Sequence, residues 1–308
     1  MPPFFCRCYD RALGRLIARF VRHPKYGLWE PASWPDSPED VGRAAPRRVE
    51  FIEPKKGVYR FEVDSPFDSP WPESRRLRGR AFGPADAKRA VVVMHGACDN
   101  EYTYSQWMGS AFEKAGYRVL VPAAPCHLDR RPPRTFSGAP MFWSAKLTVT
   151  GIAQWLREVD ALIAQLREEG VERVGLIGYS IGSLTAGLAA TLWDDLDFVC
   201  LLAPVGHHLA ALPESRVART IWPWMQDLTP EDTELMDRWA PILRRPLKAK
   251  PLFLMTLFDD LQPIALQRHW LDAWGTPPHH EYRHGHMSIL FCRQLYKDLT
   301  AFAHEVGV

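Results

Sequence analysis

The stretch Arg173-Val-Gly-Leu-Ile-Gly-Tyr-Ser-Ile-Gly182 runs from a short apolar segment into a Gly-x-Ser-x-Gly pattern centred on Ser180. An apolar run of this length is typical of a strand buried on both faces, and the residues after it, through about Trp193, indicate a helix. Gly178 and Gly182 allow the sharp strand-to-helix turn that holds a serine hydroxyl clear of the backbone. The stretch therefore predicts that Ser180 is a nucleophile at the tip of such a turn.

On both sides of this stretch, strand and helix patterns alternate. Apolar or alternating runs predict further strands at 58–63, 75–82, 90–94, 117–121, 198–202 and 252–257. Helical spacing predicts helices over 103–115 and 152–166, one that begins near Pro263, and a last one capped by Ser288. This alternation predicts an α/β fold with a mostly parallel central sheet and helices on both faces. The interruption at about 206–248 predicts an inserted cap.

A serine is a weak nucleophile until a neighbouring base takes its proton. Beyond Ser180, the strand at 252–257 runs out into two adjacent carboxylates, Asp259 and Asp260. Four histidines follow: His279, His280, His284 and His286. The order of serine, acid and histidine is one of the known orders of a catalytic triad. Three of these histidines, 280, 284 and 286, share one face of a strand, so a metal site is a minor alternative without a supporting carboxylate or cysteine pattern.

Residues 88–304 resemble the α/β-hydrolase superfamily. The resemblance is carried by His95-Gly96 after a strand, Gly-Tyr-Ser180-Ile-Gly, Phe-Asp-Asp260-Leu-Gln-Pro and Gly-His286-Met-Ser. It implies the α/β-hydrolase fold, with Ser180 as nucleophile, His286 as base and Asp260 as acid. Asp259 is the alternative acid. It also implies that the backbone N–H groups of Ile181 and Ala97 hold the oxyanion, with Cys98 as a second candidate for the latter, and that His95 is structural.

These residues together predict a serine hydrolase that cleaves a carboxylic ester or thioester through an acyl-enzyme, with a small-molecule acyl ester as substrate and with no cofactor and no metal. The alternatives are an acyltransferase, a carbon–carbon bond hydrolase, or a ligand-binding protein that uses a hydrolase scaffold without turnover. The serine at the elbow disfavours the branches of the superfamily with an aspartate nucleophile. The absence of further glycines after His95-Gly96 disfavours the lipases with a glycine-rich oxyanion loop.

Two sets of residues are candidates for substrate binding. The loop after the strand at 117–121 holds Arg130, Arg131 and Arg134, which suit an anionic group, although a solvated loop is the favoured interpretation. In the cap, Trp222 and Trp224, together with Trp239, indicate an apolar pocket. His207-His208 can also line the site, but residues without a chemical role are favoured there.

The composition excludes several classes of protein. Of 308 residues, 46% are hydrophobic and 24% are charged, and the net charge is only +2, so a dedicated nucleic-acid binder is not expected. The sequence contains no run of about 18 apolar residues, so a membrane-spanning helix is not expected. The N-terminus lacks the pattern of a secretory signal, and the six cysteines are scattered, so we expect free thiols and a cytoplasmic location.

The N-terminal part, residues 1–46, is expected to differ from the hydrolase domain at 47–308. Residues 4–22 predict an amphipathic helix, and residues 24–46, with five prolines, predict an extended arm. Arg7, Arg11, Arg15 and Arg19 form one slanting basic stripe on that helix. The favoured interpretation is that its apolar face packs on the hydrolase body. Peripheral contact with a membrane surface and a dimer contact are the alternatives.

Overall fold

The computed structural model describes residues 2–20, 33–55, 57–222, 225 and 227–307. The strands among these residues form one nine-stranded sheet. Its order is β1 (Glu50–Lys55), β2 (Val58–Asp64), β3 (Arg76–Phe82), β5 (Arg118–Pro122), β4 (Arg89–Met94), β6 (Arg173–Tyr179), β7 (Phe198–Leu202), β8 (Lys250–Thr256) and β9 (His279–Tyr282). The strands from β5 to β9 pair in parallel, whereas β1, β2, β3 and β5 pair antiparallel. The mostly parallel sheet predicted from the sequence is confirmed.

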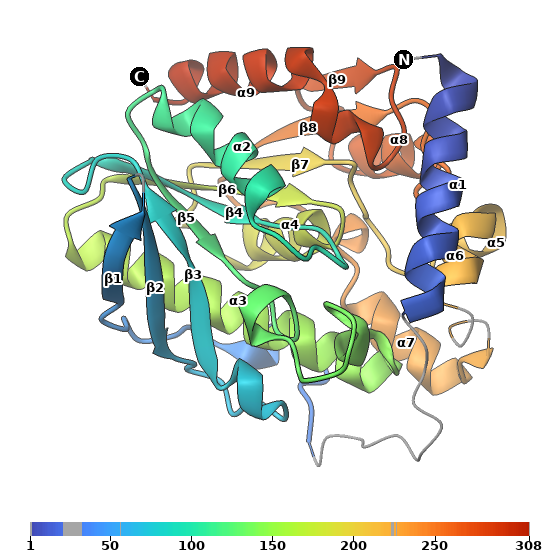
Figure 1. Ribbon diagram of the computed structural model, residues 1–308, viewed down its shortest axis with the longest axis horizontal. Coiled ribbons are helices and arrows are strands. Elements are labelled where there is room, and N and C mark those ends of the chain that lie inside the picture. Colours follow the sequence, from blue (N-terminus) through green and yellow to red (C-terminus); the bar gives the residue numbers. More distant parts are fainter. Residues whose placement is uncertain (1, 21–32, 56, 223–224, 226, 308) are drawn as a thin grey trace.

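Helices cover both faces of the sheet (Figure 1). One face carries α2 (Thr103–Glu113) and α9 (Arg293–Glu305), and the other carries α3 (Ala145–Glu168), α4 (Ile181–Leu192) and α8 (Ile264–Ala273). Strand β4 shows why its sequence is continuously apolar. Val91 and Val93 belong to the core under α2 and α9, while Val92 and Met94 belong to the core under α3 and α4. Successive side chains of a strand point to opposite faces, so a doubly covered strand needs apolar residues at every position.

The parallel strands end at one edge of the sheet, and the segments that follow them meet there. Met94 of β4 pairs with Gly178 of β6, so the loop after β4 begins beside the turn after β6. The chain between β7 and β8 forms α5 (Ala211–Glu214), α6 (Arg216–Ile221), α7 (Pro230–Arg238) and the 3-10 helix η6 (Pro241–Leu243). This is the segment predicted as a cap.

The N-terminal helix α1 (Pro3–Phe20) packs against α6 and the short 3-10 helix η7 (Ser288–Phe291). Figure 1 shows it crossing the edge where the parallel strands end. Its buried positions are Cys6, Asp10, Gly14 and Ile17, which lie three or four residues apart on one face. The structure thus has the arrangement that the sequence favoured, in which this helix packs on the α/β domain.

Two expectations about local structure are corrected. The predicted arm at 24–46 lies partly outside the described residues, and within the described part Pro38–Val41 form the 3-10 helix η1 instead of extended chain. Ser288 does not cap the last helix, because α9 begins at Arg293. Ser288 instead opens η7, and its hydroxyl accepts a hydrogen bond from the Gly285 N–H at 2.9 Å. Further 3-10 helices among the described residues are η2 (Pro72–Ser74), η3 (Leu128–Arg130) and η4 (Ala139–Phe142).

Candidate active site

Ser180 lies on the turn between β6 and α4 with a φ of 55° and a ψ of −120°. A positive φ is uncommon for a residue with a side chain, and such strain persists only where the surroundings enforce it. The flanking glycines are required by the same turn. A Cβ atom on Gly178 would collide with the carbonyl oxygen of Gly182, and one on Gly182 would collide with the carbonyl oxygen of Met94. The predicted strand-to-helix elbow is therefore present.

Of the four candidate histidines, the structure brings His286 to Ser180. The Nε2 atom of His286 lies 2.8 Å from the Ser180 hydroxyl, and the imidazole is buried. The Tyr179 hydroxyl, next to Ser180 in the chain, donates to the His286 carbonyl at 3.0 Å. Within the described residues, no three histidine, cysteine, aspartate or glutamate side chains gather in a group that could hold a metal ion.

The carboxylate on the other side of the imidazole belongs to Asp259. Its Oδ2 lies 2.8 Å from Nδ1 of His286, so the three side chains form one chain of hydrogen bonds. Oδ1 of Asp259 accepts from the backbone N–H groups of Leu261 at 2.8 Å and Gln262 at 2.7 Å. This turn, in which an aspartate side chain binds the N–H groups that follow it, fixes the carboxylate facing the histidine.

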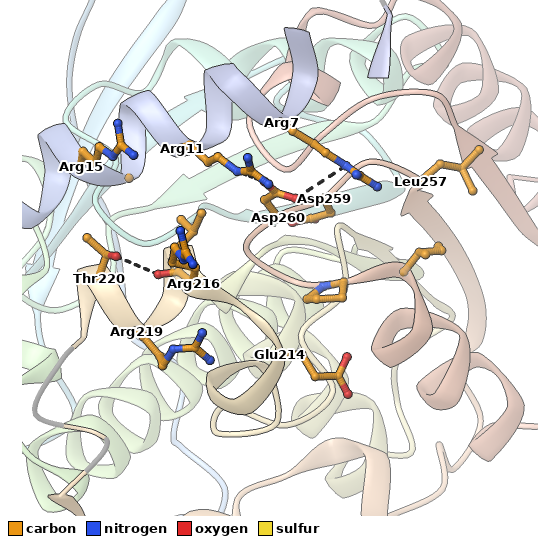
Figure 2. A pocket seen from close by; sticks show the side chains of 14 residues that line it. Arg7, Arg11, Arg15, Glu214, Arg216, Arg219, Thr220, Leu257, Asp259 and Asp260 are labelled. Atoms are coloured by element: carbon orange, nitrogen blue, oxygen red, sulfur yellow. Dashed lines mark hydrogen bonds and ion pairs between the residues drawn. The ribbon is translucent and has the colours of Figure 1, made fainter. Parts of the chain in front are cut away.

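The prediction that Asp260 is the acid is wrong. Its carboxylate lies on the α1 side of the loop and pairs with Arg11 at 2.5 Å and with Arg7 at 3.7 Å, as Figure 2 shows. The physical reason is that Asp259 is held by its own turn, and the next side chain leaves the backbone in another direction. The spacing of residues along the chain cannot decide which of two adjacent side chains in a loop faces the histidine.

The surroundings of His286 set its protonation. Burial lowers the pKa of the imidazole, but Asp259, Asp10 and Asp99 oppose this, and the net effect raises the pKa above its ordinary value of 6.5. Burial in turn raises the pKa of Asp10 to about 6 and that of Asp99 to about 7. The imidazole of His286 is thus surrounded by carboxyl groups that favour its charged form.

The loop after β4 carries the predicted oxyanion donor. His95 is buried, and burial lowers its pKa to about 4, so the ring is neutral. Its Nε2 accepts from the Ala124 N–H at 2.9 Å, and its Nδ1 therefore donates to the Gly96 carbonyl, 2.8 Å away. In a trans peptide the C=O and the following N–H point in opposite directions. His95 thus fixes the direction of the Ala97 N–H, and Ala97 and Ile181 both line the cavity at Ser180.

Comparison with family models matches residues 91–303 to the alpha/beta hydrolase family. The chain belongs to this family. Comparison with curated protein sequences finds no match.

Several solved structures share the fold at low sequence identity. Acetyl xylan esterase 1 from a Thermoanaerobacterium species is 13% identical with a TM-score of 0.64, over 96% of this chain and 98% of that one. An acetyl xylan esterase from a Paenibacillus species is 15% identical with a TM-score of 0.59, over 93% and 98%. An acylaminoacyl peptidase from Pyrococcus horikoshii is 15% identical with a TM-score of 0.58, over 86% of this chain, which spans only 42% of that peptidase.

In this hydrolase-family chain, the space immediately beside Ser180 is small. A cavity of about 30 Å³ is bounded by Ala97, Ile181 and cap residues that include His208 and Trp222. Both ring nitrogens of His208 and the indole nitrogen of Trp222 are buried and have no hydrogen-bond partner among the described residues. They are therefore polar groups that a substrate could engage. Of the two predicted cap tryptophans, Trp222 lies at the site, and Trp224 lies outside the described residues.

Two larger cavities flank α1. One of about 630 Å³ lies between α1 and α6 (Figure 2). Five arginines line it: Arg7, Arg11, Arg15, Arg216 and Arg219. The other, of about 480 Å³, is largely apolar, and Leu16, Trp107 and Phe291 contribute to its walls. It shares Ile17, Ala97, Cys98 and Met287 with a small cavity at Ser180 and His286.

The arginine loop predicted for substrate binding does not line the cavities at Ser180. Arg130 is fully buried and makes two hydrogen bonds to Glu158 of α3, at 2.7 and 2.5 Å. It also donates to the carbonyl oxygens of Ala123 and Ser74, each at 2.6 Å. Arg131 and Arg134 are exposed. The prediction is corrected: Arg130 joins this loop to α3, and its charge is neutralised within the core.

Replacing Arg130 by Met should destabilise the protein by roughly 3–5 kcal/mol, because it leaves the Glu158 carboxylate buried without its counter-ion. Urea unfolding measures this loss. The double variant Arg130→Met/Glu158→Leu should recover much of it, since both charges are then removed. Arg131→Ala is the control and should change stability by less than about 0.5 kcal/mol. A single Arg130→Met variant as stable as the wild type would contradict the structural role.

Proposed function

We propose that the protein is a serine hydrolase that cleaves a carboxylic ester or thioester through an acyl-enzyme on Ser180. The observation that carries the proposal is the continuous chain of hydrogen bonds from Asp259 through His286 to the Ser180 hydroxyl, with both links at 2.8 Å. A base that is itself oriented by a third group is the arrangement that activates a serine.

In the proposed reaction, His286 removes the hydroxyl proton as Ser180 Oγ attacks the carbonyl carbon of the substrate. The N–H groups of Ala97 and Ile181 stabilise the negative charge on the carbonyl oxygen. Asp259 keeps the proton of His286 on Nδ1 and stabilises the imidazolium. His286 then donates its new proton to the leaving alcohol or thiol. Water deprotonated by the same histidine attacks the acyl-enzyme and regenerates Ser180.

The apolar cavity beside α1 supports a substrate with an apolar part. Its walls include Leu16, Trp107 and Phe291, and it reaches Ala97 and Cys98 of the loop that supplies the oxyanion donor. Apolar walls with a few convergent polar groups are typical of small-molecule sites. We therefore assign the apolar chain of the ester to this cavity and the reacting carbonyl to the space beside Ser180.

Labelling with a fluorophosphonate probe tests the activated serine, and a panel of p-nitrophenyl esters, thioesters and anilides tests the reaction. We expect labelling at Ser180 and turnover of esters or thioesters faster than anilides. Labelling together with acyl transfer to an added alcohol, and little hydrolysis, would favour an acyltransferase. Labelling without turnover of any ester would favour a carbon–carbon bond hydrolase. An unlabelled protein would indicate a binding protein without catalysis.

We also propose peripheral contact of α1 with a membrane surface. The supporting observation is the exposure of Phe4, Phe5, Tyr9 and Leu16, of whose surface 71%, 60%, 42% and 48% is accessible. Exposed apolar clusters on a helix are typical of interfacial elements. Two arginines of the predicted basic stripe, Arg7 and Arg11, are engaged by Asp260. No helix among the described residues is long and apolar enough to cross a bilayer.

The membrane proposal predicts that the full chain co-sediments with vesicles of anionic phospholipid and that Phe4→Ser/Phe5→Ser reduces this severalfold. The variant should retain its fold and its turnover of soluble esters, because both side chains face solvent. Equal sedimentation of the variant and the wild type would contradict the proposal.

A further inference from the structure

Asp10 is a buried carboxylate on α1, outside the strands and loops that carry the candidate triad, with only 3% of its surface exposed. Its Oδ2 accepts from the N–H of His286 at 2.8 Å and from the N–H of Asp260 at 3.4 Å. Its Oδ1 accepts from the N–H of Met287 at 3.1 Å. One side chain therefore joins the loop of the base to the loop of the acid.

The histidine loop passes directly over this carboxylate. A Cβ atom on Gly285 would collide with Asp10 Oδ2, so only glycine allows the loop to approach so closely. The helix is held in place from two further points. Arg11 pairs with Asp260 at 2.5 Å, and the buried side chain of Ile17 belongs to the hydrophobic core. The contact of Asp10 with His286 is thus one of several contacts that fix the position of α1.

We infer that Asp10 is a positioning residue for His286: its carboxylate holds the backbone of residues 286 and 287, and its negative charge favours the imidazolium that forms during catalysis. This inference rests on the proposed function. Asp10 does not touch the reacting atoms and acts only through His286. Hydrogen bonds from N–H groups to a charged acceptor are stronger than neutral ones, and a carboxylate provides enough lone pairs for all three donors.

The electrostatics agree with this geometry. Burial raises the pKa of Asp10 to about 6, so the carboxylate is charged above that pH, where it raises the pKa of His286. The charged and titratable groups around His286 and Asp10 come from four places: Asp10, Arg7 and Arg11 of α1, Asp259 and Asp260 of the acid loop, Asp99 of the loop after β4, and Tyr179 of β6. Loss of the charge on Asp10 should lower the pKa of His286.

The test is Asp10→Asn, a variant of the same shape without the charge. The base must be neutral to accept the serine proton, so kcat/KM of the wild type should rise through a pKa above 6.5. In Asp10→Asn this rising limb of the pH profile of kcat/KM should move to lower pH. We expect kcat to fall on the order of 10- to 100-fold with KM little changed, because a small displacement of a catalytic group is costly. Active sites are counted with the fluorophosphonate probe, so unfolded protein does not enter the rate.

Arg11→Gln is the matched control. It removes the ion pair that ties the same helix to the acid loop but leaves the three N–H contacts of Asp10. It should change kcat less than about threefold and should not move the pH limb to lower pH, because losing a positive charge favours the imidazolium. A second variant, Gly285→Ala, displaces Asp10 by steric contact without removing its charge. It should lower kcat while shifting the limb less than Asp10→Asn does. It keeps the inference testable if Asp10→Asn does not fold.

An NMR titration of the His286 imidazole separates this inference from the proposed function, because it needs no turnover. A pKa lower in Asp10→Asn than in the wild type supports the role of Asp10 even if no ester is hydrolysed. Three results would overturn it: an unchanged imidazole pKa, an unchanged kcat per labelled site in Asp10→Asn, or an equal loss in Arg11→Gln.

Discussion

Ser180→Ala is expected to lower kcat for the best ester of the panel on the order of 10⁶-fold, and to abolish labelling by the fluorophosphonate probe. The reason is that the hydroxyl forms the covalent bond in the proposed reaction, and no other hydroxyl lies at hydrogen-bond distance from the buried imidazole of His286 among the described residues. The remaining rate should reflect substrate binding and the oxyanion donors alone. Steady-state kinetics with highly purified protein measures the loss.

The variant should be nearly as stable as the wild type. Removing the hydroxyl leaves the backbone hydrogen bond from the Ser180 N–H to the Leu202 carbonyl in place, at 3.0 Å. Thermal unfolding checks this. Ser110→Ala on α2 is the matched control, because within the described part of the chain its hydroxyl donates only to the Trp107 carbonyl. The activity of this control should be that of the wild type. Turnover by purified Ser180→Ala near that of the control would show that Ser180 is not the nucleophile.

Asp259→Asn is expected to lower kcat on the order of 10⁴-fold. The two backbone N–H groups of Leu261 and Gln262 donate to Oδ1, so an amide at this position must place its oxygen there. Its NH₂ group then faces Nδ1 of His286 and donates to it. The imidazole is forced to carry its proton on Nε2, where it can no longer accept the proton of Ser180. The variant should therefore fold but acylate very slowly.

Asp260→Asn is the comparison that decides between the adjacent carboxylates. Its carboxylate faces Arg7 and Arg11 on α1, and the substitution should cost less than about tenfold in kcat. Stopped-flow measurement of the acylation rate of both variants, normalised to the protein concentration, gives the ranking. Equal losses, or a larger loss in Asp260→Asn, would refute the assignment of Asp259.

The elements of the fold follow from local patterns in the sequence. The run from Ala90 to Met94 is apolar at every position because helices cover both faces of β4, and a doubly covered strand has no polar side. The glycines around Ser180 predict the elbow, since only glycine permits the close approaches seen there. The position of His286 in the sequence, just before the last helical pattern, also made it recognisable. Strand and helix positions and two members of the candidate triad were therefore predictable.

What the tertiary structure alone decided are the directions and partners of side chains. Asp259 and Asp260 are the same residue type at adjacent positions. Only the turn in which Asp259 accepts from the N–H groups of Leu261 and Gln262 selects which of them faces His286. The sequence pattern around Arg130 is that of an exposed loop, but its side chain lies in the core, because Glu158 of helix α3 neutralises its charge. Asp10 contacts a loop 276 residues away in the chain. Such contacts form only when the whole core has brought distant segments together, so no local pattern encodes them.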